Sequence, residues 1–273
     1  ATRQDYWRRT AFTEAQWMEL RQHADARDVL FLSSAFSTEA VDLLHRVGIP
    51  AWKVASGETS NTPMLRKMAE TGLPILLSTG MSGTEEIDDA VSLIKSMHVP
   101  LAVYQCTNRY PCPAEHVGLN MIPEFQSRYR VPIGFSDHSG RSACALAALS
   151  AGACSIEVHV VFSRKCFGPD VGASLTFEEL GQLVNDVRFV ETALASPVDK
   201  TDEAEALTDV RRLFTKSIVA ARNLSPGHTL TMADLAFKKP GTGVPAGRYE
   251  AVIGKTLKKR IARDEQLALE DLE

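Results

Sequence analysis

The sequence lacks any apolar run of the length that a membrane span requires. A transmembrane helix needs about 20 consecutive apolar residues, whereas the apolar stretches here are strand-sized. The N-terminal residues, Ala1 to Asp5, carry no hydrophobic signal segment. A net charge of −4 and a pI near 6.0 provide no general attraction to nucleic acid or to an anionic membrane. We therefore expect neither partner, and an anionic substrate must be held by local positive groups.

Cysteine is scarce and irregularly spaced. The five cysteines are odd in number and form no C-x-x-C pair, which argues against a disulfide framework and against a zinc finger. A cytoplasmic location is therefore expected. Cys106 and Cys154 lie within apolar runs, so we predict that both are small buried hydrophobic side chains.

Up to residue 195, short apolar runs alternate with amphipathic helical patterns. Thr13 with Gln16, Ser82 with Glu85, and Thr176 with Glu179 form capping patterns that predict helix starts. Alternation of this kind is typical of a parallel sheet that is covered by helices. The six runs that predict strands cover residues 29–34, 51–56, 74–79, 101–106, 131–136 and 154–159.

The polar ends of these runs favour a closed barrel over an open sheet. Each apolar run stops at small polar or ionisable residues. In a barrel such ends converge on one catalytic rim, whereas an open doubly wound sheet spreads them along a line. We therefore predict a (β/α)8 TIM barrel, although only six of its eight units are visible in the sequence.

The pattern changes after residue 195. Residues 196–216 begin with a polar, acidic stretch and are expected to form a linker. Residues 217–273 predict a small module with a strand at 217–221 and a capped turn near Thr231. We therefore expect a barrel domain at 1–195, a linker and a C-terminal domain at 217–273.

Two histidines follow neighbouring predicted strands. His138 comes after Ser136 and Asp137, and His159 ends the next run beside Glu157. Two imidazoles on adjacent rim positions suit one divalent transition metal, with water or substrate oxygens as further ligands. Asp137 and Glu157 are candidates for supporting or catalytic carboxylates. The alternative is a pair of loop histidines with only structural hydrogen bonds.

Lys53 lies inside an apolar run, and strand alternation points it into the predicted barrel. An unpaired buried ammonium is costly, so Lys53 needs an anion from the protein or from a ligand. A Schiff-base lysine and a lysine that reaches solvent at a strand end are the alternatives. Neutral donors that could share a phosphate with Lys53 are Ser34, Ser56, Ser78, Asn108 and Ser136.

Two further carboxylates are candidates for contact with a polar substrate. Glu58 stands in an all-polar stretch at the rim, where its neighbours could equally serve as helix caps. Asp170 follows Gly168-Pro169 in the last barrel loop and either belongs to a turn or faces a ligand.

The ordered set of rim motifs closely resembles the sialic acid synthase family, which includes N-acetylneuraminate, legionaminate and pseudaminate synthases. The tail from Ser217 resembles the family's C-terminal antifreeze-like (SAF) β-clip domain, including Lys239-Pro240-Gly241. The motifs are Phe31-Leu32-Ser33-Ser34, Lys53-Val54-Ala55-Ser56-Gly57-Glu58, Leu77-Ser78-Thr79-Gly80-Met81, Cys106-Thr107-Asn108-Arg109-Tyr110-Pro111, Gly134-Phe135-Ser136-Asp137-His138, Glu157-Val158-His159 and Gly168-Pro169-Asp170.

The resemblance implies condensation of phosphoenolpyruvate with the aldehyde of an N-acyl hexosamine, which gives a nine-carbon 2-keto acid and phosphate. It implies Mn²⁺ or Mg²⁺ on His138 and His159, and a homodimer with exchanged SAF domains. It assigns phosphoenolpyruvate to Ser34, Lys53, Ser56, Ser78, Asn108 and Ser136, and the sugar to Glu58, Tyr110, Asp170 and Lys239. In this assignment His138, His159, Lys53 and Glu58 carry the catalysis.

The sequence departs from the family pattern in three ways. The family's first two strands, which carry acidic, Lys and Gln residues, have no counterpart, so we expect a barrel without its first two β/α units. Lys239 stands where a sugar-contacting arginine is usual, and Val158 replaces a basic residue. Alternatives are a non-catalytic or incomplete remnant, a related phosphoenolpyruvate–sugar condensing barrel, and a Schiff-base aldolase that uses Lys53.

Overall fold

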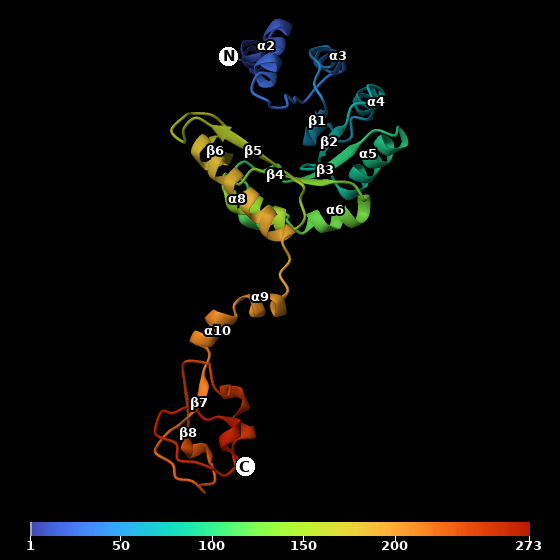
Figure 1. The fold of residues 1–273 in the computed structure, drawn as a ribbon. Coiled ribbons are helices and arrows are strands. Elements are labelled where there is room, and N and C mark those ends of the chain that lie inside the picture. The colour runs from blue at the N-terminus through green and yellow to red at the C-terminus, as the bar shows by residue number, and fades with distance from the viewer. Residues whose placement is uncertain (1) are drawn as a thin grey trace. The chain divides into compact units, whose positions relative to one another are not determined.

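The computed structural model describes residues 2–273. The chain divides into two compact units, the first ending at Ala195 and the second running from Ser196 to Glu273. The first unit contains a parallel sheet with its helices, and the second contains a small antiparallel pair (Figure 1). Within residues 2–273 no helix has both the length and the apolar character of a membrane span.

Six strands of the first unit form one parallel sheet, in which the spatial order equals the chain order (Figure 1). The five strands predicted from residue 51 onward are confirmed with small shifts at their ends. The sheet curls into an open half barrel, and the complete eight-unit barrel stays a prediction. The strands are β1 (Trp52–Val54), β2 (Ile75–Ser78), β3 (Leu101–Cys106), β4 (Ile133–Asp137), β5 (Ser155–Val161) and β6 (Ser174–Thr176).

The prediction of a strand at residues 29–34 was wrong. Only Ser34 pairs, through an isolated parallel bridge to Lys53. Residues 29–33 have no ladder partner in the described part of the chain, and Leu30 is 78% exposed. The sixth strand is β6 instead. It was not predicted because only one of its three residues, Leu175, is apolar.

From α3 to β5 helices alternate with the strands, and the later helices, such as α5, α6 and α8, cover the convex face of the sheet (Figure 1). The predicted caps of Thr13 with Gln16 and of Thr176 with Glu179 are confirmed by reciprocal hydrogen bonds. The helix predicted to be capped by Ser82 with Glu85 begins one residue later. Its N-cap is Gly83, whose N–H donates to Glu86. The helices are α1 (Arg3–Thr10), α2 (Glu14–Asp25), α3 (Thr38–Val47), α4 (Thr62–Glu70), α5 (Thr84–Ser96), α6 (Met121–Tyr129), α7 (Ser142–Ser150) and α8 (Phe177–Ala195).

The core lies between the convex face and the helices. Trp52, Leu77, Val103 and Phe135 point outward from successive strands and are almost fully buried there. Cys154, which we expected to be buried, is exposed because it precedes β5 at the sheet border. The apolar core thus lies on the convex side of the sheet, and polar residues lie on the inner side.

The second unit has its own apolar core. It contains α9 (Lys200–Ala206), α10 (Thr208–Phe214), β7 (Ser217–Ala220) and β8 (Leu235–Lys238), and β7 pairs with β8 in antiparallel register. The helices α9 and α10 occupy the stretch expected as a linker. Its core side chains include Ile218, Leu230, Val252, Leu257, Ile261 and Leu267.

A buried carboxylate organises the turns of this unit. Asp234 is 1% exposed and accepts hydrogen bonds from Arg222, His228 and Thr231. Burial alone would raise the pKa of Asp234, but these hydrogen bonds outweigh it and hold the pKa well below its usual range. The folded state therefore favours the ionised carboxylate.

We predict that Gly134→Ala destabilises the first unit. A Cβ at Gly134 would lie 2.5 Å from the ring of Tyr104 on the neighbouring strand. The ring or the strand must shift, at a cost of about 1–3 kcal/mol. Urea unfolding followed by tryptophan fluorescence measures the loss. Gly181→Ala in α8 is the matched control, because no atom lies within 4 Å of its added methyl group, and an unchanged midpoint for Gly134→Ala would contradict the packing argument.

We predict that Asp234→Asn destabilises the second unit at neutral pH by about 3 kcal/mol, because it removes the charge from a buried, hydrogen-bonded carboxylate. The folded-state pKa of Asp234 is depressed, so its stabilisation is complete above the unfolded-state pKa and is lost as the pH falls through the folded value. Hydrogen exchange at Ile218 and Val219 in the intact chain should show a large variant effect at pH 7 that shrinks below about pH 4. A pH-independent difference would refute the electrostatic origin.

Candidate active site

Parallel register sets the inward-facing side chains in rows. Cys106 pairs with Ser136, and Ser136 pairs with Glu157 on the next strand. Just beyond this row, the rings of His138 and His159 lie edge to face with centroids 5.2 Å apart. The carboxyl ends of β3, β4 and β5 therefore bring a thiol, a hydroxyl, a carboxylate and two imidazoles together.

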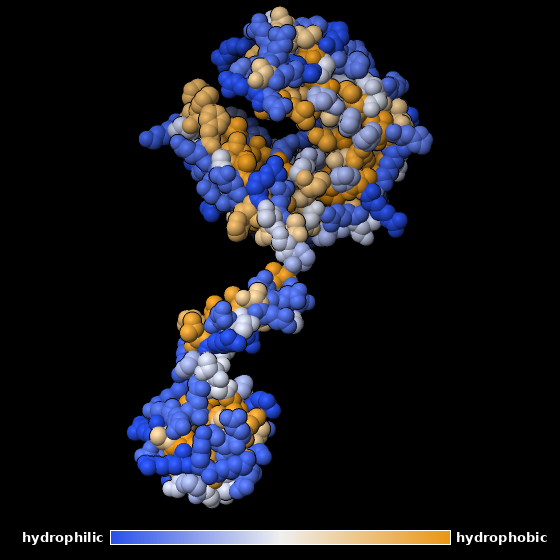
Figure 2. Space-filling view, viewed as in Figure 1, coloured by the Kyte–Doolittle hydropathy of each residue, from blue (hydrophilic) through white to orange (hydrophobic). Residues whose placement is uncertain are grey.

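These rows line a cavity of about 450 Å³ on the inner side of the sheet. Nine of the twelve residues assigned to phosphoenolpyruvate, sugar or metal lie together here, and the candidate carboxylate Glu157 lies with them. The nine are Ser34, Lys53, Ser56, Ser78, Asn108, Tyr110, Ser136, His138 and His159. Figure 2 shows the first unit hollowed between its N-terminal helices and the segment after β5, with apolar side chains at the border.

Lys53 has a protein anion as its partner. Its Nζ lies 3.3 Å from Oε2 of Glu157 and donates a hydrogen bond to Ser78. The ammonium also lies 5.4 Å from the ring centroid of Tyr104, a distance at which a cation and an aromatic face attract. Ser136 donates to the other oxygen of Glu157 at 2.6 Å. The inner cavity therefore contains a linked lysine, carboxylate and hydroxyl.

Tyr104 forms the floor beneath this group. Its hydroxyl accepts a hydrogen bond of 2.7 Å from Ser155, and its ring fills the space that Gly134 leaves free. Burial raises the pKa of Tyr104, so the phenol stays neutral. The Tyr104 ring on β3 can therefore occupy this position only because residue 134 on β4 has no side chain.

His138 is held in one tautomer. Its Nδ1 lies 2.9 Å from the carbonyl oxygen of Thr107, which can only accept, so Nδ1 carries the proton. The hydroxyl of Tyr110 donates to Nε2 at 3.1 Å, and its ring stacks on the imidazole at 4.1 Å. Burial raises the pKa of Tyr110 to about 12 and lowers the pKa of His138, so a neutral imidazole accepts from a neutral phenol.

The two histidines fit a divalent metal as a pair of ligands. A carbonyl partner on Nδ1 is the arrangement that orients Nε2 of a metal-bound histidine, and His138 has it. His159 has its Nδ1 3.9 Å from a carboxylate oxygen of Asp170. Among residues 2–273 no group of three or more His, Cys, Asp or Glu side chains could hold a metal. Water or substrate must therefore complete any coordination.

Three predicted sugar contacts do not line the cavity. The carboxylate of Glu58 accepts from Asn61 at 2.8 Å, which matches the helix-capping environment considered for this stretch. Asp170 reaches only the outer histidine, His159. Lys239 belongs to the second unit, where its ammonium lies 4.7 Å from the ring centroid of Phe214.

Asp137 has a structural position. It accepts from both the N–H and the hydroxyl of Ser139, at 2.8 and 3.0 Å, and it is buried on the helix side of β4. Strand alternation turns it away while Ser136 and His138 face the cavity. Asp137 therefore shapes the turn after the strand and does not supply a cavity carboxylate.

The cavity lining also includes five residues that were not predicted as part of the site, namely Phe36, Ala55, Gly57, Met81 and Cys106. Cys106 was expected to be buried and is, but it lies on the cavity side of β3. Phe36 and Met81 border the opening and are 67% and 58% exposed. Cys106 lies two residues after Tyr104, so strand alternation would have placed its thiol on the inner face. Loop side chains such as Phe36 follow no such alternation.

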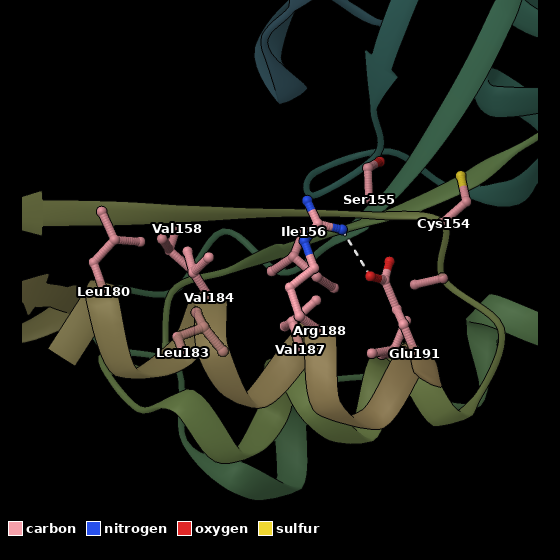
Figure 3. A pocket seen from close by; sticks show the side chains of 12 residues that line it. Cys154, Ser155, Ile156, Val158, Leu180, Leu183, Val184, Val187, Arg188 and Glu191 are labelled. Carbon is pink, nitrogen blue, oxygen red and sulfur yellow. Dashed lines mark hydrogen bonds and ion pairs between the residues drawn. The ribbon is translucent and has the colours of Figure 1, made fainter. Parts of the chain in front are cut away.

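A second hollow, of about 330 Å³, lies on the opposite face of β5. Figure 3 shows Leu183, Val184 and Val187 of α8 turned toward Ile156 and Val158, with an ion pair of Arg188 and Glu191 near one end. Val158 therefore packs toward a helix and does not face the histidines. The residue that departs from the family's pattern is therefore not part of the cavity lining.

A curled parallel sheet with a polar, two-histidine cavity at the carboxyl ends of its strands is the arrangement of a β/α-barrel enzyme. The profile of the NeuB family matches residues 1–199, and that of the SAF domain matches residues 215–273. The chain therefore belongs to the NeuB family of sialic acid synthases and carries a C-terminal SAF domain.

Relatives and solved structures agree with this family. N,N'-diacetyllegionaminic acid synthase of Campylobacter jejuni is 33% identical over 250 residues, which are 90% of this chain and 74% of that protein. N-acetylneuraminate-9-phosphate synthase of Homo sapiens is 32% identical over 266 residues, or 96% and 73%. The N-acetylneuraminic acid synthetase structure from Leptospira borgpetersenii, in complex with citrate, has a TM-score of 0.68 at 29% identity over 74% of this chain and 72% of that chain.

We predict that His138→Ala and His159→Ala each weaken Mn²⁺ binding at least about tenfold, because each removes one of only two protein ligands. Calorimetric titration of the intact chain with Mn²⁺ measures the change. His116→Ala is the control, since His116 is exposed and lies outside the cavity. Unchanged Mn²⁺ affinity in both cavity variants would contradict the assignment of His138 and His159 as metal ligands.

Proposed function

We propose that the chain is a synthase that condenses phosphoenolpyruvate with the open-chain aldehyde of an N-acyl hexosamine. The reaction consumes water, forms a carbon–carbon bond between the enol carbon and the aldehyde carbon, and releases phosphate. The observation that carries the proposal is one cavity that joins an ammonium, several neutral donors and two imidazoles. The family membership supplies the reaction class.

The inner end of the cavity is suited to an anion. Lys53 supplies a positive charge, and hydroxyls from four different segments surround it together with the amide of Asn108. Several short neutral donors around one cation can share the oxygens of a phosphate or carboxylate. The overall charge of the chain is negative, so this local set must provide the attraction for phosphoenolpyruvate.

The outer end is suited to the sugar aldehyde. His138 and His159 would hold Mn²⁺ or Mg²⁺, which when bound orients and polarises a carbonyl oxygen. Tyr110 stacks on His138 and lies edge-on to His159 at 5.5 Å, so its hydroxyl must leave Nε2 before that nitrogen can serve another partner. The contacts of Tyr110 thereby orient the imidazole of His138.

The environment of Lys53 disfavours the Schiff-base alternative. A carboxylate, a hydroxyl and an aromatic face all interact favourably with an ammonium. A charged ammonium has no lone pair with which to attack a ketone. The homodimer with exchanged SAF domains, the sugar contacts of Glu58, Asp170 and Lys239, and the cytoplasmic location stay predictions.

The proposal predicts phosphate release that needs three components together. Intact chain with Mn²⁺, phosphoenolpyruvate and a panel of N-acyl hexosamines should release phosphate and form a 2-keto acid in equal amounts. Lys53→Met should lower turnover at least about a hundredfold, because the neutral side chain loses the anion contact. Omission of sugar or metal should abolish release.

The alternatives give different outcomes in the same assay. Borohydride trapping of pyruvate on Lys53 would support the aldolase. A folded chain that binds Mn²⁺ and phosphate but produces no 2-keto acid with any sugar would favour the non-catalytic remnant. Product from an unacylated pentose but from no N-acyl hexosamine would favour a related condensing enzyme.

A further inference from the structure

The cavity carries a carboxylate where an anion is to bind. Among its lining residues, Lys53 and Glu157 are the two that carry formal charges. Their charges are opposite and their charged atoms lie 3.3 Å apart. Glu157 also accepts from Ser136 at 2.6 Å and therefore engages two of the groups assigned to phosphoenolpyruvate.

Glu157 is close to the histidine pair as well. It lies two residues before His159 on β5, and both side chains belong to the inner face. The carboxylate contributes to the electrostatic environment of His138, where it favours positive charge and opposes the dominant effect of burial on the pKa. One negative charge therefore acts on both ends of the cavity.

We propose that Glu157 is a positioning residue that strengthens cation binding at His138 and His159 and weakens anion binding at Lys53. The inference rests on the proposed function and deepens it. Because Glu157 neutralises Lys53, the cavity without a cation has little net attraction for a multiply charged anion. A divalent cation at the histidines restores that attraction, so occupation of the anion site depends on the cation.

A purely structural role for Glu157 leads to a different expectation. Lys53 keeps its hydrogen bond to Ser78 and its contact with the ring of Tyr104 when Glu157 loses its charge. A glutamine can still accept the hydrogen bond from Ser136. Glu157→Gln should therefore preserve the cavity, whereas a scaffold residue would weaken every ligand together when replaced.

The experiment measures two affinities of the intact chain by calorimetry, one for Mn²⁺ alone and one for inorganic phosphate alone. Glu157→Gln should raise the Kd for Mn²⁺ and lower the Kd for phosphate, each on the order of tenfold, because it removes one negative charge from the cavity. Glu157→Asp, which keeps the charge, should stay within about threefold of the unsubstituted chain for both ligands. Lys53→Met should shift both affinities in the opposite directions.

Glu124→Gln is the matched control, because it removes the same charge from an exposed position on α6, outside the cavity. It should leave both affinities unchanged. If Glu157→Gln weakens both ligands or changes neither, the inference is overturned while the proposed function stands. If the unsubstituted chain binds neither Mn²⁺ nor phosphate, including phosphate in the presence of Mn²⁺, the proposed function fails first. Thermal unfolding of each variant verifies that it is folded.

Discussion

Lys53 and Glu157 stand on β1 and β5, with three strands between them, yet their charged atoms lie 3.3 Å apart. In a flat sheet, four strand spacings would separate them by about 19 Å. The contact therefore requires the curl of the sheet, and the cavity exists because of that curl. A charge on the inner face would be costly without a partner, so the pair also makes a polar interior tolerable.

The two faces of the sheet differ in polarity because of this curl. Outward side chains such as Trp52 and Phe135 are buried against helices and hold the strands. Inward side chains carry hydroxyls, a carboxylate and imidazoles, and the backbone fixes some of them, as the carbonyl of Thr107 fixes the tautomer of His138. The candidate site thus occupies one face of the sheet, while the apolar core occupies the other.

Much of this arrangement was predictable from the chain. Apolar runs with polar ends located five of the six strands, because parallel strands buried by helices need continuous hydrophobicity. The rim residues from Ser34 to His159 were predicted to converge, and nine of them line the cavity. The strand prediction for residues 29–33 was wrong because hydrophobicity alone does not provide a ladder partner. The strand β6 was missed because only one of its three residues is apolar.

The sequence by itself determined the alternation of strands and helices, the family and the identity of most rim residues, because periodicity and ordered motifs are local properties of the chain. Only the tertiary structure decided that Glu157 pairs with Lys53, that Asp137 faces the helices, that Glu58 turns to Asn61 and that Val158 packs toward α8. These outcomes depend on the curl, the strand register and the side-chain parity of several strands at once. Such relations join residues far apart in sequence, so no single segment contains them.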